Sequence, residues 1–200
     1  MTDQLDVHRR TMAIAQSVVD QVEVRHLALP TPCAAWNLGE LLAHMVGQNH
    51  GFAAAARGGA ADRALWVDRP VGDDPVGAFR VSVSDVVSAF AEPESVARDW
   101  WLAEFSTERR FPAQRAIGFH LLDYLVHAWD VAVTIGAPIA FDPDMEYAVL
   151  EVAEAIPDGP GRLDPGAAFR PSIALVRETS TLDRILTLLG RSPSWSDGRT

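Results

Sequence analysis

Asp123 and His127 are four residues apart in a stretch with the apolar spacing of a helix, so both side chains leave successive turns on one face. This spacing directs two ligand atoms toward one point, as the two histidines of the zinc-binding HExxH motif do. His44, in the apolar run 41–46, is the best candidate for a third ligand, because helical bundles build metal sites from facing helices. Three protein ligands leave one coordination position open, which is typical of a catalytic metal site.

Two further polar residues share the helix face of this pair. At roughly 100° per residue, His120 and Asp130 both fall on the side of Asp123 and His127. The helix is apolar around much of its circumference, and burying a carboxylate beside imidazoles is costly unless a cation offsets the charge. Asp130 can accept the free imidazole N–H of His127 and fix its tautomer, or it can form a cap or an ion pair. His120 either lines the pocket or packs structurally.

Each of these residues also has an ordinary structural explanation. A lone histidine on an apolar face is more often a hydrogen-bonded core residue than a ligand. Asp123 and His127 also have the spacing of a simple helix ion pair. The residue pattern alone therefore leaves a metal site and a structural cluster equally open.

Other reactive or aromatic side chains give weaker signals. Cys33 precedes a predicted helix and can become reactive there, although a small core side chain is the favoured interpretation. Trp36 and Trp129 are expected in the core. Three arginines can steer an anionic substrate or form a solvated face: Arg109, Arg110 and Arg115. Three histidines lack partners by spacing and are interpreted as surface or structural residues: His8, His26 and His50.

The composition limits the classes of protein. A chain of 200 residues, 48% hydrophobic and 22% charged, is expected to form one domain with a well-filled core. Its net charge of −10 disfavours nucleic acid and anionic membranes as partners. The chain lacks both a long apolar run and a signal-peptide pattern, so a cytoplasmic location is expected. The single cysteine fits a reducing compartment and excludes a thiolate-rich zinc site.

Apolar periodicity predicts the helices that must position these residues. They span 4–24, 37–57, 75–91, 112–134, 144–155 and 181–189. Asn37 is the expected N-cap of the second helix, with Glu40 in capping-box position, and Gly136 is the stop signal of the fourth. Residues 93–111 are expected to form a loop or short helix, and residues 156–171 an irregular segment. Helices alternating with loops indicate an all-α bundle.

Three motifs stand out along the chain: TPCAAWNLGELLAHMVG at 31–47, LVHAWDVA at 125–132, and a C-terminal pattern with LDRIL at 182–186 and LGR at 189–191. Together they resemble the DinB-like superfamily, and in particular the branch related to mycothiol-dependent maleylpyruvate isomerase. The resemblance implies a four-helix bundle with additional short C-terminal helices. It also implies that a metal, zinc or alternatively nickel, is held by His44, Asp123 and His127.

The resemblance further implies two parts: a metal-binding bundle at 1–155 and an irregular extension at 156–200 whose short helix packs on the bundle. This chain departs from the isomerase pattern in two ways. Asp123 stands where the isomerase has the longer glutamate, which affects the reach of the ligand. The isomerase also has a further C-terminal domain that contributes to its thiol site, whereas only residues 156–200 remain here.

The function implied is that of a metal-dependent enzyme that activates a low-molecular-weight thiol, such as mycothiol, for transfer to or isomerisation of a small electrophile. The metal-bound water or thiol is the one catalytic group predicted. Two alternatives stay open: a non-catalytic sensor or carrier of metal or a small ligand, and an interaction module with an internal ion-pair network. The native metal, the thiol, the electrophile, the role of Cys33 and the formation of a homodimer also stay open.

Overall fold

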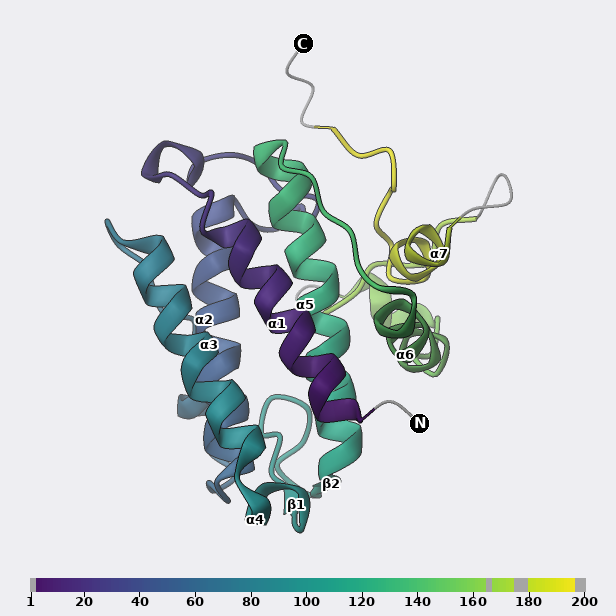
Figure 1. Ribbon diagram of the computed structural model, residues 1–200. Helices are drawn as coiled ribbons and strands as arrows, with labels where there is room; N and C mark the ends of the chain where they lie inside the picture. The colour runs from purple at the N-terminus through teal and green to yellow at the C-terminus, as the bar shows by residue number, and fades with distance from the viewer. Residues whose placement is uncertain (1–2, 165–166, 175–179, 197–200) are drawn as a thin grey trace.

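Four long helices form a bundle in the computed structural model, which describes residues 3–164, 167–174 and 180–196 (Figure 1). The four helices are α1 (Gln4–Val19), α2 (Leu38–Ala56), α3 (Pro75–Ala91) and α5 (Ala113–Ile135). Their apolar faces meet in one core, to which each helix contributes fully buried side chains such as Met12, Leu41, Phe79 and Tyr124. The prediction of an all-α fold is confirmed.

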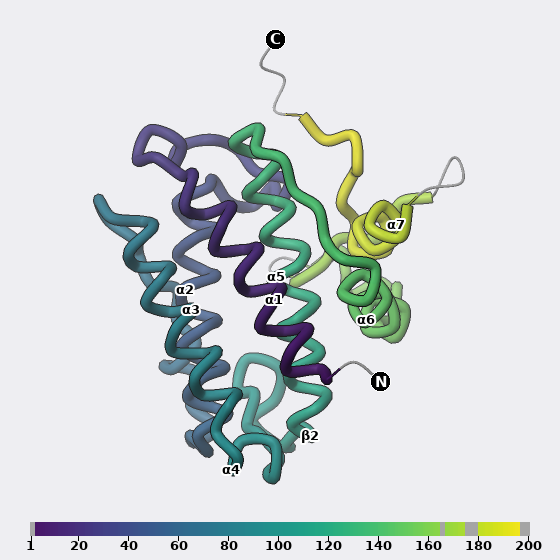
Figure 2. The backbone as a smooth tube through the Cα atoms, viewed as in Figure 1, coloured from purple at the N-terminus to yellow at the C-terminus, as the bar shows by residue number. Residues whose placement is uncertain are grey.

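The four helices are arranged as two parallel pairs. Gln4 donates a hydrogen bond to Gln114 near the start of α1 and α5, so these two helices run in the same direction. Arg57, just after α2, bonds Glu92, just after α3, so these two also run in the same direction. The two pairs are antiparallel to each other, as the tube in Figure 2 shows. The link between α2 and α3 must therefore return along the whole bundle.

That link packs closely against α2. The backbone N–H of Arg69 donates to the carbonyl of Ala43 at 2.9 Å. Gly47 has no side chain where the link passes, and a Cβ there would lie only 2.5 Å from the carbonyl oxygen of Val67. This close approach places Asp68 beside the middle of α2, in reach of its side chains.

The remaining elements close the ends and one side of the bundle. The short helix α4 (Pro93–Val96) precedes a two-stranded antiparallel ladder of β1 (Asp99–Trp100) and β2 (Phe111–Pro112), in which Trp100 pairs with Phe111. The helices α6 (Pro143–Glu154) and α7 (Thr181–Leu188) pack on each other beside α5 (Figure 1). Three 3-10 turns complete the description: η1 (Val24–His26), η2 (Arg63–Trp66) and η3 (Pro160–Leu163).

The helix boundaries follow the local sequence signals closely. Asn37 and Glu40 form the predicted capping box of α2, and Gly136 ends α5 in the left-handed conformation at φ 70°. The first helix ends at Val19, before the predicted residue 24, and Pro112 is the N-cap of α5 and not its first residue. Each strand has only two residues, which is too short for an alternating pattern to predict it.

The C-terminal segment is attached through apolar contacts. Ile185, Leu186 and Leu189 are fully buried and belong to the continuous hydrophobic core. The division of the chain at residue 155 stays a prediction. None of the helices in the described part of the chain has the length and apolarity that a membrane span requires.

Candidate metal centre

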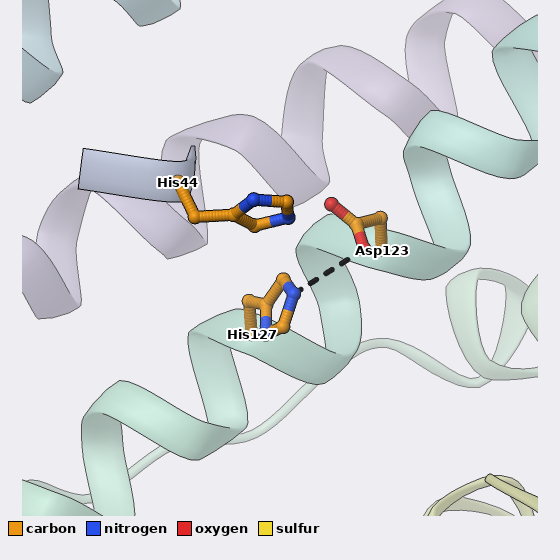
Figure 3. A group of neighbouring side chains, drawn as sticks. All are labelled: His44, Asp123 and His127. Atoms are coloured by element: carbon orange, nitrogen blue, oxygen red, sulfur yellow. Dashed lines mark ion pairs between the residues drawn. The ribbon is translucent and has the colours of Figure 1, made fainter. Parts of the chain in front are cut away.

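His44 from α2 meets Asp123 and His127 from α5, as the sequence predicts (Figure 3). Asp123 and His127 lie one turn apart on the same face, and the antiparallel α2 brings His44 opposite them. One potential ligand atom from each residue lies within 4.8 Å of the other two. The Nε2 atom of His127 is 3.3 Å from an Asp123 carboxylate oxygen.

Each of the two imidazoles contacts its own carboxylate, which is not one of the three candidate ligands. His127 Nδ1 is 3.0 Å from Asp130 Oδ2, and His44 Nδ1 is 3.2 Å from Asp68 Oδ1. An ionised carboxylate only accepts hydrogen bonds, so each ring donates from Nδ1 and keeps Nε2 as the nitrogen that can bind a cation. This is the arrangement by which carboxylates orient metal-binding histidines.

The charges within the group are strongly coupled. Burial favours the neutral carboxyl, but the neighbouring histidines, first His127, lower the pKa of Asp123 to about 2. Burial likewise opposes the charge of His127, but Asp123 and Asp130 raise its pKa to about 9. Burial lowers the pKa of His44, so this ring is neutral at pH 7. The metal-free group therefore contains a buried carboxylate–imidazolium pair.

The residues present fit a divalent cation. Asp123 Oδ2 is buried and has no hydrogen-bond partner among the described residues, which is costly for a carboxylate oxygen. Two imidazole nitrogens and one carboxylate oxygen are the ligands that zinc accepts, and nickel also binds imidazole. A cation would pair the orphaned oxygen and replace the second proton of His127.

A cavity of about 950 Å³ opens over the three residues, a size that suits a small organic ligand. The indole of Trp36 packs on the imidazole of His44, with ring centroids 4.4 Å apart. The walls come from α2, α5, α6, the loop between β1 and β2, and the C-terminal segment. Charged and polar residues of these walls include Gln48, Asp68, Glu104, Arg115, Arg170 and Arg191.

The two additional residues predicted on this helix face have different positions. Asp130 is fully buried and accepts from His127 and, at 3.3 Å, from Arg191 Nη2. His120 is not among the residues that line the cavity. Its ring nitrogens contact His8 Nε2 at 2.9 Å and Asn49 Oδ1 at 3.2 Å, so it packs in the core. Of the two interpretations that the sequence left open for His120, the contacts favour structural packing.

The weaker candidates also separate. Cys33 lines the cavity, and burial raises the pKa of its thiol, which is therefore protonated at neutral pH. Arg115 lines the cavity with its guanidinium over an aromatic ring, while Arg109 and Arg110 stack on rings outside it. Trp129 is buried as expected.

The residues of the site that did not emerge from the sequence include Gln48, Asp68, Glu104 and Arg191. Gln48 lies four positions after His44, so the helical spacing that selected Asp123 and His127 would have placed it on the same face. The other three come from loops, where spacing does not determine direction.

Fold and site together define a helical-bundle protein with a candidate two-histidine, one-aspartate metal centre at the floor of a cavity. The family of the mycothiol maleylpyruvate isomerase N-terminal domain matches residues 8–132, and the chain belongs to this family. The family match thus includes all three candidate ligands.

Relatives and solved structures extend this comparison. Uncharacterized proteins from two strains of Mycobacterium tuberculosis are 29% identical over 195 residues, which cover 95% of this chain and 98% of theirs. A crystal structure of the mycothiol-dependent maleylpyruvate isomerase matches with a TM-score of 0.58 and 16% identity, covering 76% of this chain and 67% of that chain. A histidine-to-alanine mutant of the same enzyme gives the same TM-score at 15% identity. At these identities the structures support the shared fold.

Proposed function

We propose that this protein binds a divalent metal, zinc or alternatively nickel, through His44, Asp123 and His127. We further propose that it uses the metal to activate a low-molecular-weight thiol, such as mycothiol, toward a small electrophile. The observation that carries this proposal is the convergence of three ligand atoms within 4.8 Å around an unpaired buried carboxylate oxygen, at the floor of a cavity. Membership of the isomerase-domain family and the name of the structural relative support the thiol.

The bound cation would stabilise a thiolate at neutral pH, since free thiols ionise only near pH 8.5. The residues of the chain prepare this step. Asp130 and Asp68 fix the directions of His127 and His44, so that both Nε2 atoms face the same point. His127 must lose its second proton when the site is loaded, because Asp123 and Asp130 hold that proton in the metal-free protein. A cytoplasmic location, where small thiols are reduced, fits this function.

Metal analysis of protein purified without an affinity tag tests the first half of the proposal. We expect about one equivalent of zinc or nickel after loading, as a three-ligand site requires. His50→Ala is the matched control, because His50 bonds Asp85 outside the cavity. Loaded wild type with less than about a tenth of an equivalent, and no change in His127→Ala, would overturn the site.

The second half needs a turnover assay. Thiols are screened against maleylpyruvate and other small electrophiles with the loaded protein. We expect thiol-dependent consumption that a chelator abolishes and added metal restores. Metal binding without turnover of any electrophile would contradict the enzyme and favour a carrier or sensor.

A further inference from the structure

Gln48 places a buried side-chain amide at one end of the cavity. It lies one helical turn after His44, is 3% exposed, and lines the same cavity as the candidate ligands. Its Nε2 atom has no hydrogen-bond partner among the described residues. Buried donors are almost always paired, and an unpaired one costs free energy. A donor in this position indicates an acceptor supplied by the ligand.

The carboxyl of Glu104 faces the same end of the cavity from the loop between β1 and β2. Burial, followed by the charge of Asp123, raises the pKa of Glu104 to about 7, and Asp68 acts in the same direction. The Gln48 amide lies close enough to the Glu104 carboxyl to lower its pKa. The separation or angle between them nevertheless does not meet the geometry of a hydrogen bond from Gln48 Nε2. The charge of Arg63 opposes this rise in pKa. This end therefore offers one N–H donor and one carboxyl acceptor, with Asp68 and Asp123 as the acidic neighbours that raise the pKa of Glu104.

The aromatic walls of this end are suited to an uncharged group. Phe105 and Phe119 stack with ring centroids 5.3 Å apart, and Phe52, one helical turn after Gln48 on α2, also lines the cavity. Arg170 and the buried Arg191 line the opposite end of the cavity. Arg115 also lines the cavity, with its guanidinium carbon 5.5 Å from the centroid of the Phe119 ring, so one basic side chain accompanies the acidic ones near Gln48.

We propose that Gln48 and Glu104 form a specificity subsite that binds a neutral hydroxyl or amide group of the ligand and rejects a carboxylate. This inference rests on the proposed function, because the ligand is anchored by its thiol at the metal centre. A hydroxyl or amide oxygen accepts from Gln48 while its O–H or N–H donates to Glu104. A carboxylate cannot donate, and it would lie among the charges of Glu104, Asp68 and Asp123.

Cobalt-substituted protein allows a direct test, because a thiolate bound to Co²⁺ produces a charge-transfer absorption. The probes are 1-thioglycerol and 3-mercaptopropionate, which are similar in length and carry hydroxyls or a carboxylate. We expect wild type to bind 1-thioglycerol about tenfold more tightly. Gln48→Leu should weaken 1-thioglycerol binding by about fivefold to tenfold, and Glu104→Gln should strengthen 3-mercaptopropionate binding. Circular dichroism checks the folding of each variant.

Gln114→Leu is the matched control, because Gln114 lines the cavity but is exposed. It should leave both affinities unchanged. In wild type, 1-thioglycerol should also shift the NMR signals of the Gln48 side-chain amide. Failure to bind Co²⁺, or the absence of a thiolate band with both probes, overturns the proposed function and the subsite with it. Co²⁺ binding with equal affinities for the two probes in wild type and Gln48→Leu overturns the subsite alone.

Discussion

Two histidine clusters share helix α5, and they show what separates a structural histidine from a candidate ligand. The closed cluster links all four bundle helices: His8 bonds His120, His120 bonds Asn49, and Asn49 bonds Ser82 at distances of 2.9, 3.2 and 2.8 Å. Asn49 Oδ1 can only accept, so His120 donates from Nε2 and accepts at Nδ1 from His8. All its linking groups are neutral and paired. The open cluster, two turns along α5, has carboxylate partners, an unpaired oxygen and a cavity.

His127 of the open cluster titrates in the opposite direction from the histidines of the closed cluster, whereas the pKa of His44 is lowered by burial as theirs are. Burial lowers the pKa of His8 to about 3 and that of His120 well below its usual value. In the open cluster the carboxylates overcome burial and raise the pKa of His127 to about 9. Burial is therefore common to both clusters, and His127 differs in that two carboxylates, Asp123 and Asp130, together hold a second proton on its ring.

The largest effect should come from breaking the closed cluster. His120→Ala leaves a cavity and two unpaired buried groups, on His8 and Asn49, so we expect it to lower the free energy of unfolding by about 4 kcal/mol. Urea unfolding of the metal-free protein measures this loss. Zinc stoichiometry of the folded variant should be unchanged. A variant that keeps wild-type stability but loses zinc would reverse the roles that we assign to the two clusters.

Breaking the open cluster should affect metal binding most strongly. His127→Ala removes a candidate ligand, so zinc affinity should fall by more than about 100-fold, beyond the loss typical of an orienting residue. Competition with a chromogenic chelator gives the affinity. His120→Ala is the internal comparison, because both histidines lie on α5 and both are buried. Equal zinc affinity in His127→Ala and wild type would exclude the centre.

The helical spacing of the sequence predicts most of the fold and the three candidate ligands. Periodicity and caps place α2, α3 and α5 within one or two residues, because these signals act within a single turn. The same spacing could not separate His120 from His127, since both lie on one face of α5. Their partners come from other helices, and only the packing of α1 and α2 against α5 determines which residues these are.

The surroundings of the site could not be predicted for a related reason. Asp68, Glu104 and Arg191 lie outside the helices, so no period fixes the direction of their side chains. Gly47 is the one local signal for Asp68, because a glycine within a helix can permit a close approach of another segment. The sequence does not reveal which segment that is.

The metal-free protein should lose stability on both sides of neutral pH, because lowered histidine pKa values act on the acid side and the raised pKa of His127 acts on the alkaline side. The folded pKa of His8 lies below the usual 6.5, so stability should fall as pH decreases from 6.5 toward 3. The folded pKa of His127 lies above 6.5, so the stability it contributes is present below 6.5 and is lost as pH rises through 9. Each limb has a slope of at most about 1.4 kcal/mol per pH unit for one proton.

Urea unfolding across this pH range tests the assignment with one variant for each limb. His8→Gln should reduce the slope of the acid limb, to which His120 and His44 also contribute, and His127→Gln should flatten the alkaline limb. The lowered pKa of Asp123 adds a loss only below about pH 4. The raised pKa of Glu104 contributes stability that is lost as pH rises through 7, so each variant is compared with wild type at the same pH. If His127→Gln flattens the acid limb instead, the protonation states assigned to the two clusters are wrong.

The smallest effect should come from the carboxylates that orient the ligands. Asp68→Asn keeps the size of the side chain but weakens its hold on His44, so zinc affinity should fall about tenfold. Asp85→Asn is the matched control, because Asp85 contacts His50 Nδ1 at 3.0 Å in the same geometry but outside the cavity. Isothermal titration should show no change in zinc affinity for this control.

The two orienting carboxylates differ in solvent exposure, and we expect their substitutions to lower zinc affinity by different amounts. The side chain of Asp68 is 53% exposed, whereas that of Asp130 is fully buried, so water can replace the first hydrogen bond but not the second. Asp130→Asn should therefore weaken zinc binding more than Asp68→Asn, toward about 100-fold. Because Asp130 also bonds Arg191, a milder loss in Asp130→Asn than in Asp68→Asn would show that Asp130 serves the C-terminal segment and not His127.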